Sequence, residues 1–178
     1  FRTPSEASDW LEESAFEEVG RAVAAGLAQY PAPEVLELSV GRQVTVRAPG
    51  RIDFGGGWSD TPPFSLEHGG AVLNAAVLLD GKRPIAARGE MLAEPVIELI
   101  SADGQTRETI ADAAGLGRYR QPGDCLSLHR AAIILAGLAK PEGDLPSQLR
   151  RAGGGVRLET DIRLPHGSGL GTSSILAG

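Results

Sequence analysis

The amino-acid sequence predicts a mixed α+β fold, in which hairpins of β-strands are separated by single helices. Asp-Gly pairs stand between β-prone runs at Asp80-Gly81 and at Asp103-Gly104, which is the pattern of a tight hairpin. Residues 156–164 alternate between apolar and charged side chains, as a half-buried strand does, and helical spacing occurs at 8–30 and 124–139. Strands and helices do not alternate regularly, so a doubly wound parallel sheet is disfavoured.

The composition narrows the class of protein. The chain has 178 residues, of which 42% are hydrophobic and 22% charged, as expected for one globular domain. A net charge of -6 argues against a broad surface for nucleic acid or membrane. The single cysteine, Cys125, is expected to be a buried structural thiol, and it excludes an internal disulfide. No apolar run of transmembrane length and no secretion signal is recognisable, so we expect a cytoplasmic protein.

The first element is a helix over residues 8–30. Asp9 and Glu12 form a capping box at its start, and prolines 31 and 33 follow its end. Because the sequence opens on Phe1 and not on methionine, we interpret residues 1–34 as a helical linker or arm that can follow an upstream domain.

Strands and hairpins are expected next. Short strands at 35–40 and 44–47 precede two hairpins, and the helix at 124–139 is bounded by a later proline. The hairpins are predicted to pair residues 71–79 with 83–88 and residues 96–100 with 106–110.

A glycine-rich loop follows the strand at 156–164. It reads Pro165-His-Gly-Ser-Gly-Leu-Gly-Thr-Ser-Ser, with glycines at every second position. This spacing turns successive N–H groups inward, and hydroxyl-bearing residues from Thr172 open a helix whose N-terminus attracts anions. Strand, glycine loop and helix start are typical of a phosphate cradle, although a capped glycine turn also fits the spacing. No lysine follows the last glycine, so it is not a Walker A loop.

A second glycine cluster lies at 46–63. Three consecutive glycines (55–57) suit neither a strand nor a helix, so we expect a sharp turn or a close approach to another group. Arg51, Asp53, Trp58 and Asp60 bracket them. A carboxylate accepts hydrogen bonds from sugar hydroxyls, an indole packs on a sugar ring, and a guanidinium polarises a hydroxyl. A surface turn with solvated charges is the alternative for each residue taken alone.

Together the two clusters resemble motifs of the GHMP kinases. The family motif P-x-x-x-G-L-G-S-S-A wraps the phosphates of ATP and is matched from Pro165 to Ser173, with Thr172 and Ser174 as departures. Ala48-Pro-Gly-Arg51 resembles the first motif of the family. The continuation Gly-Gly-Trp-Ser-Asp-Thr-Pro-Pro resembles the L-fucose kinases and, less closely, the heptose-phosphate kinases. The resemblance covers residues 44–178.

The resemblance implies a fold and a reaction. Residues 35–178 would form the N-terminal, ATP-binding domain of a GHMP kinase, similar to domain 2 of ribosomal protein S5. The enzyme would transfer the γ-phosphoryl group of ATP to the anomeric hydroxyl of L-fucose, with Mg²⁺ as the metal. Its partners would be the sugar and ATP, with no nucleic acid or membrane.

The resemblance also implies roles for named residues. Arg51, Gly57, Trp58 and Asp60 would contact the sugar, and Arg51 would assist the reaction. Ser173 would be the ligand of Mg²⁺. The ATP-binding residues would be Pro165, Gly167, Ser168, Gly169, Leu170, Gly171, Thr172 and Ser173.

Two further expectations concern completeness and alternatives. GHMP kinases with an aspartate base carry it downstream of the phosphate loop, so we expect the general base to lie outside this chain. The domain would then be truncated before a C-terminal kinase domain, and the isolated chain would be inactive. A heptose-phosphate kinase would need extra basic residues for its substrate, whereas a non-catalytic sugar or nucleotide sensor would keep both loops without the base.

Overall fold

The computed structural model describes residues 3–27, 39–121, 123–165, 170 and 172–177. The chain divides into two units, Phe1–Glu34 and Val35–Gly178. In the described part of the chain, no helix is both long enough and apolar enough to cross a lipid bilayer.

The first unit is built on one helix, α1 (Pro4–Leu27). Its capping box is formed by Thr3 and Glu6, and not by Asp9 and Glu12 as predicted. The Glu6 N–H donates to Thr3 Oγ1 at 3.2 Å, and the Thr3 N–H donates to Glu6 Oε2 at 3.0 Å. Pro4 occupies the first helical position, where its missing N–H is not needed, so the helix starts earlier than residue 8. Prolines 31 and 33 lie outside the described residues.

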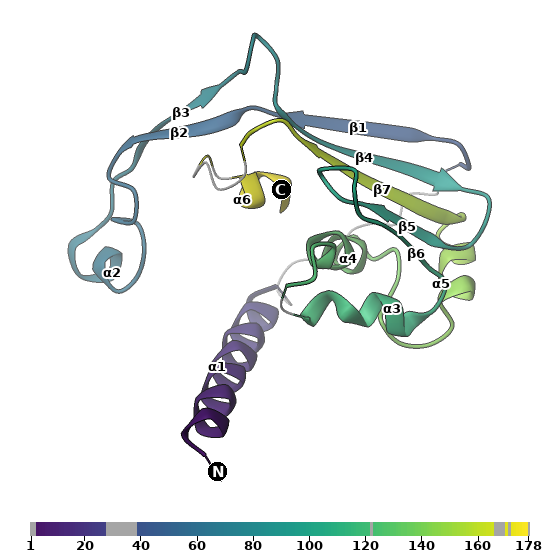
Figure 1. Ribbon diagram of the computed structural model, residues 1–178, viewed down its shortest axis with the longest axis horizontal. Helices are drawn as coiled ribbons and strands as arrows, with labels where there is room; N and C mark the ends of the chain where they lie inside the picture. Colours follow the sequence, from purple (N-terminus) through teal and green to yellow (C-terminus); the bar gives the residue numbers. More distant parts are fainter. Residues whose placement is uncertain (1–2, 28–38, 122, 166–169, 171, 178) are drawn as a thin grey trace. The chain divides into compact units, whose positions relative to one another are not determined.

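The second unit contains a five-stranded sheet with the order β1-β4-β7-β5-β6 (Figure 1). All neighbouring strands are antiparallel except β5 and β7, which are parallel. The strands are β1 (Gln43–Ala48), β4 (Ile85–Leu92), β5 (Ile97–Ile100), β6 (Arg107–Ile110) and β7 (Gly155–Ile162).

A separate two-stranded sheet pairs β2 (Gly50–Gly55) with β3 (Leu73–Val77). The short helix α2 (Phe64–His68) lies between these strands in the chain. We call residues 50–77 the β-arm. Figure 1 shows it extending from one end of the larger sheet, with α2 near its tip.

Helices cover one face of the larger sheet (Figure 1). Between β6 and β7 the chain forms α3 (Ala113–Gly117), the 3₁₀ turn η1 (Arg118–Arg120), α4 (Ser127–Leu135) and α5 (Leu145–Arg151). The last helix, α6 (Thr172–Ala177), lies on the same side and contacts β4. The apolar core between sheet and helices includes Ile97, Leu99, Ile110, Leu116, Leu126, Ile133, Leu145, Leu149 and Val156. This arrangement is α+β, as the sequence predicted.

The last strand of the sheet, β7, is inserted between β4 and β5. The short connection 93–96 joins those two strands, and β7 begins directly beside it. A Cβ atom on Gly155 would lie 2.0 Å from the carbonyl oxygen of Glu94, and one on Gly154, whose φ is +142°, would lie 2.3 Å from that of Leu92. Only glycine allows the backbone to pass this closely, so the glycine pair permits the insertion.

The structure confirms some predicted elements and corrects others. The hairpin β5–β6 and the strand β7 form within a few residues of the predicted ranges. The turn at Asp80-Gly81 also forms, with φ of +49° and +72°. However, β3 pairs with β2, and β4 pairs with β1 and β7, so the predicted pairing of 71–79 with 83–88 was wrong except for the bridge between Leu79 and Lys82.

Three other predictions need correction. Of the strand predicted at 35–40, residues 35–38 lie outside the described part, and the remaining two form no strand. The helix predicted at 124–139 ends at Leu135, because Gly137 adopts φ +71° and the Leu138 N–H donates to the Ile133 carbonyl. Cys125 is exposed, not buried.

A buried arginine joins the helical layer to the edge of the sheet. Arg130, on α4, is fully buried. Its Nε donates to the Gly115 carbonyl at 3.0 Å, its Nη1 to Asp124 at 2.8 Å and its Nη2 to Glu108 of β6 at 2.6 Å. Burial raises the pKa of the Asp124 carboxyl, but the Leu126 N–H and Arg130 outweigh this effect, so the pKa lies below its usual value.

We predict that Arg130→Met destabilises the fold by about 1–3 kcal/mol. It removes the buried cation of the cluster and leaves Glu108 and Asp124 with the more exposed Arg118, which lies 3.1 and 3.2 Å from them. Urea denaturation measures this change. Arg151→Met, on the exposed end of α5, is the matched control and should change stability by less than about 0.5 kcal/mol. Equal stabilities for the two variants would contradict a structural role for the cluster.

A buried histidine makes the stability dependent on pH. His129 is buried, and its Nε2 lies 3.0 Å from Thr160 Oγ1. Burial lowers the pKa of His129, and the nearby charge of Arg130 adds to this effect. Below about pH 6.5 the unfolded chain therefore binds a proton that the folded chain resists, and stability falls.

We predict that the free energy of unfolding of the wild-type protein decreases between about pH 6.5 and 5, whereas that of His129→Gln stays nearly level in this window. Denaturation at several pH values measures both curves. Parallel curves for the two proteins would assign the pH dependence to other groups.

Candidate functional site

The turn at the tip of β2 is held against residues 70–71 by glycines and one serine. A Cβ atom on Gly56, whose φ is +78°, would lie 1.9 Å from the Ala71 carbonyl oxygen. A Cβ atom on Gly70 would lie 2.5 Å from the Ser59 carbonyl oxygen. The Ser59 hydroxyl accepts the Ala71 N–H at 3.0 Å and lies 2.6 Å from the Gly56 carbonyl oxygen. The glycine cluster therefore serves a close approach, as predicted, and the partner is the chain itself.

Most of the predicted glycine cluster that precedes this turn lies in strands, at the end of β1 and in β2. Residues 50–55 form β2, because each of residues 50–53 pairs with a residue of β3 and a bulge then precedes Gly55. The sequence interpretation missed this strand because its glycines discouraged a strand assignment.

The predicted sugar-binding residues occupy two places on the β-arm. Arg51 lies within β2, and its Nη2 bonds to Asp53 Oδ2 at 3.2 Å. Gly57, Trp58 and Asp60 lie in the turn after β2, and all three are exposed. Trp58 is 83% exposed, and its backbone has φ +73°, a conformation that residues other than glycine rarely adopt. A large apolar ring is thus presented to solvent on a turn with a defined backbone.

The two sequence motifs meet at the base of the β-arm. Gly50 is buried, and a Cβ atom there would lie 3.4 Å from the side chain of Leu164 and 3.5 Å from that of Val77. Leu164 directly precedes Pro165, where the glycine-rich loop begins. The Arg163 N–H also donates to the Pro84 carbonyl at 2.9 Å. The tertiary structure therefore brings the start of the second motif beside Arg51.

The glycine-rich loop is described only in part. Pro165 is exposed, Leu170 is half-buried, and Thr172 is the first residue of α6, as predicted. Gly167, Ser168, Gly169, Gly171 and the side chain of Ser173 lie outside the described residues. Within the described part of the chain, no three or more His, Cys, Asp or Glu side chains are grouped so that they could hold a metal ion.

Sequence reasoning missed two residues of the turn. Ser59 and Gly70 fix its geometry, yet neither was singled out. No sequence pattern singles them out, because the approaches of Gly56 to Ala71 and of Gly70 to Ser59 arise only when the chain folds back on itself.

No family model matches the chain. It is 35% identical over 171 residues to an L-fucokinase/L-fucose-1-P guanylyltransferase of Bacteroides fragilis, and 38% identical over 136 residues to a bifunctional fucokinase/GDP-fucose pyrophosphorylase of Arabidopsis thaliana. These matches cover 93% and 76% of this chain, but the chain spans 18% and 12% of those proteins.

A solved structure has the same fold. The D-glycero-D-manno-heptose 1-phosphate kinase of Bacteroides thetaiotaomicron matches with a TM-score of 0.50 at 23% identity, over 76% of this chain and 39% of that one. The sequence relatives and the shared fold support the resemblance of this chain to the GHMP kinases. The two sequence matches are to fucokinases, as the sequence of the β-arm indicated.

We predict that Gly70→Ala loosens the turn of the β-arm, because its Cβ would meet backbone atoms of Ser59 and Asp60 at 2.5–2.8 Å. Limited proteolysis followed by mass spectrometry should show cleavage within residues 56–71 that is several-fold faster than in the wild type. Gly57→Ala is the matched control, since a Cβ atom there meets nothing within 4 Å. Equal cleavage rates for both variants would contradict the close approach.

Proposed function

We propose that the protein is an ATP-dependent sugar kinase that phosphorylates the anomeric hydroxyl of L-fucose to give fucose 1-phosphate. The observation that carries this proposal is the identity of 35–38% with two proteins whose names include fucokinase. It is supported by the approach of the two motifs at Gly50 and Leu164.

The proposed sugar site is the β-arm. Trp58 would pack on one face of the sugar ring, because an indole offers a large rigid surface at little entropic cost. Asp60, exposed in the same turn, would accept hydrogen bonds from sugar hydroxyls, and Gly57 would leave room for the sugar beside the turn. Arg51 would stabilise charge that develops during transfer, with Asp53 holding its guanidinium in place.

The proposed nucleotide site is the glycine-rich loop, from Pro165 to Ser173. Because α6 begins at Thr172, the last residues of the loop stand at a helix N-terminus, which fits phosphate groups. ATP supplies the transferred phosphoryl group. The hydroxyls of Thr172 and Ser173 are hard oxygen donors of the kind that Mg²⁺ accepts, and Mg²⁺ usually completes its shell with phosphates and water. We place the metal on Ser173 on this chemistry.

The domain roles and the location are also part of the proposal. Residues 35–178 would be the ATP-binding part of the kinase and residues 1–34 a helical arm. The general base would be supplied from outside these 178 residues. The cytoplasm, where ATP and Mg²⁺ are available, would be its location.

We predict that Asp60→Ala raises the KM of the intact protein for L-fucose by about 5- to 150-fold, since losing a partner for buried hydroxyls costs about 1–3 kcal/mol. A coupled assay of ADP release with L-fucose measures it. Glu142→Ala, an exposed carboxylate outside the β-arm, is the control and should leave KM unchanged.

The same assay distinguishes the alternatives. Gly169→Val should weaken ATP binding at least tenfold if the loop holds the phosphates. A heptose phosphate that is phosphorylated faster than L-fucose would replace the proposed substrate. Binding of ATP and sugar without any transfer by the intact protein would instead identify a sensor.

A further inference from the structure

The larger sheet has a second face, which the helices do not cover. Thr160 of β7 contacts His129 of α4, so even-numbered residues of β7 face the helices and odd-numbered residues face away. On β1, Val44 lines an apolar hollow together with Ala132 and Ile133 of α4, so Arg47 lies on the outer face. The direct pairing of Arg47 with Ala86, and of Ala86 with Asp161, agrees with this assignment.

Over most of this outer face, positive and negative side chains are paired. Arg157 bonds to Glu90 and to Glu98, both at 2.8 Å, and Arg88 bonds to Glu159 at 3.4 Å. Glu90 and Glu98 belong to the strands on either side of Arg157, and Glu159 belongs to the strand beside Arg88. The outer face is therefore close to neutral where the strands are longest.

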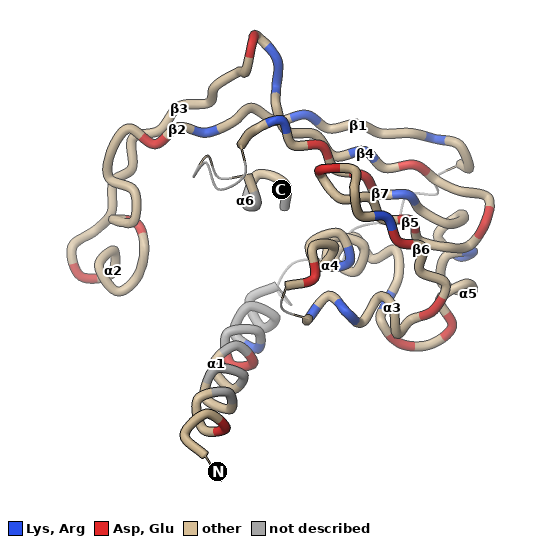
Figure 2. The backbone as a smooth tube through the Cα atoms, in the orientation of Figure 1, with Lys and Arg blue, Asp and Glu red and all other residues tan. Residues whose placement is uncertain are grey.

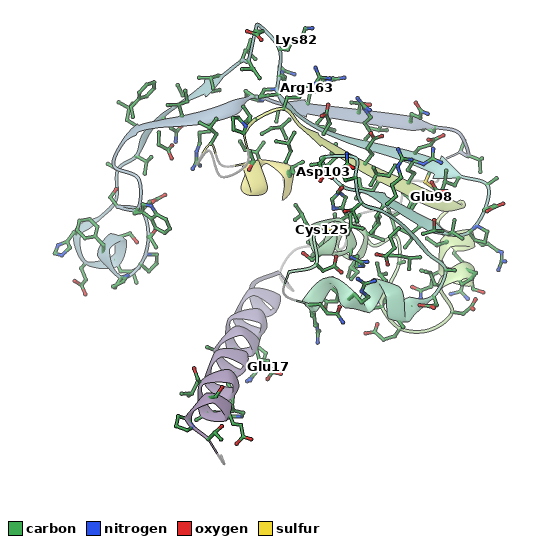
Figure 3. The ribbon with its side chains drawn as sticks, in the orientation of Figure 1. Glu17, Lys82, Glu98, Asp103, Cys125 and Arg163 are labelled. Carbon is green, nitrogen blue, oxygen red and sulfur yellow. The ribbon has the colours of Figure 1, made fainter. Side chains whose placement is uncertain are left out.

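At one corner this balance is lost. Arg47, Lys82, Arg83 and Arg163 line a hollow of about 380 Å³. Arg163 bonds to Asp161 at 3.4 Å, whereas no carboxylate of the described residues pairs with the other three. Figure 2 shows this gathering of positive residues, and Figure 3 labels Lys82 in the turn before β4 and Arg163 after β7. The protein as a whole carries a net charge of -6, so the corner is an exception.

The backbone holds these four residues in place. The Lys82 N–H donates to the Leu79 carbonyl, and the Leu79 N–H donates to the Lys82 carbonyl, both at 2.9 Å. Pro84 is buried, and its carbonyl accepts the Arg163 N–H at 2.9 Å. Three parts of the chain are thus fixed around one hollow. Their positive charges repel one another, and a bound anion would offset this repulsion.

We propose that this corner binds the diphosphate group of a small phosphorylated molecule. A guanidinium group can donate two parallel hydrogen bonds to the oxygens of one phosphate, and the lysine adds a compact positive charge. The hollow is at the lower end of the roughly 300–1,000 Å³ usual for small-molecule sites, which suits a diphosphate group. Figure 1 shows α6 on the helical side of the sheet, whereas the alternation of side chains along β1 and β7 places Arg47 and Arg163 on the other side. The proposed site does not depend on the kinase assignment.

The test measures binding of inorganic pyrophosphate to the intact protein by titration calorimetry. Arg47→Gln/Arg83→Gln should weaken it at least tenfold. Arg42→Gln/Arg151→Gln removes the same charge elsewhere and should change it less than twofold. Gly171→Val, in the glycine-rich loop, should leave binding at the corner intact. Thermal unfolding of each variant shows that it is folded.

Three results would contradict the proposed diphosphate site. No pyrophosphate binding by the wild type, equal weakening in both double variants, or loss of binding in Gly171→Val alone would overturn the proposal. ADP and a nucleoside diphosphate sugar serve as further ligands. If ADP or the nucleotide sugar binds as tightly as pyrophosphate, the site recognises the diphosphate group alone. If one of them binds more tightly, that ligand is the class of molecule that carries the diphosphate. Binding of RNA or an acidic peptide that pyrophosphate does not displace would also overturn it.

Discussion

The insertion of β7 between β4 and β5 is the constraint on which the rest of the second unit depends. A strand that is last in the chain occupies the centre of the sheet, and it can enter only where Gly154 and Gly155 pass the connection at 93–96. The preceding helices must therefore leave the edge strand β6, cross one face and return to the middle. Arg130 supports this path, since it links α4 to β6 and to the turn that precedes α4.

The same insertion positions the candidate site. Because β7 runs antiparallel to β4, it ends where β4 begins, and its last residues reach the base of the β-arm. The contact of Leu164 with the position of Gly50 follows from this direction. The larger sheet is held by the burial of apolar side chains against the helices. The turn of the β-arm is instead fixed by the close backbone approaches at its glycines and by the hydrogen bonds of Ser59. Large side chains such as Phe54, Trp58 and Leu73 stay exposed on the β-arm.

The two faces of the larger sheet differ in chemistry because they face different surroundings. One face packs on helices and is apolar, and its polar group Thr160 is satisfied by His129. The other carries cross-strand ion pairs. These pairs raise the pKa of Arg157, chiefly through its hydrogen bond to Glu98. Such pairs on an exposed face add little stability, but they set the register of charges along the strands.

The sequence by itself determined several local elements and the resemblance to the GHMP kinases. Hairpin β5–β6, strand β7 and the helix start at Thr172 depend on neighbours in the chain, such as Asp103-Gly104 and the alternation after Gly155, so their patterns are visible in the sequence. Only the tertiary structure decided that β3 pairs with β2, that β7 lies inside the sheet and that four cations from three segments share one hollow. These features depend on contacts between residues far apart in the chain, and neither propensity nor spacing encodes which distant backbone a glycine or an arginine will meet.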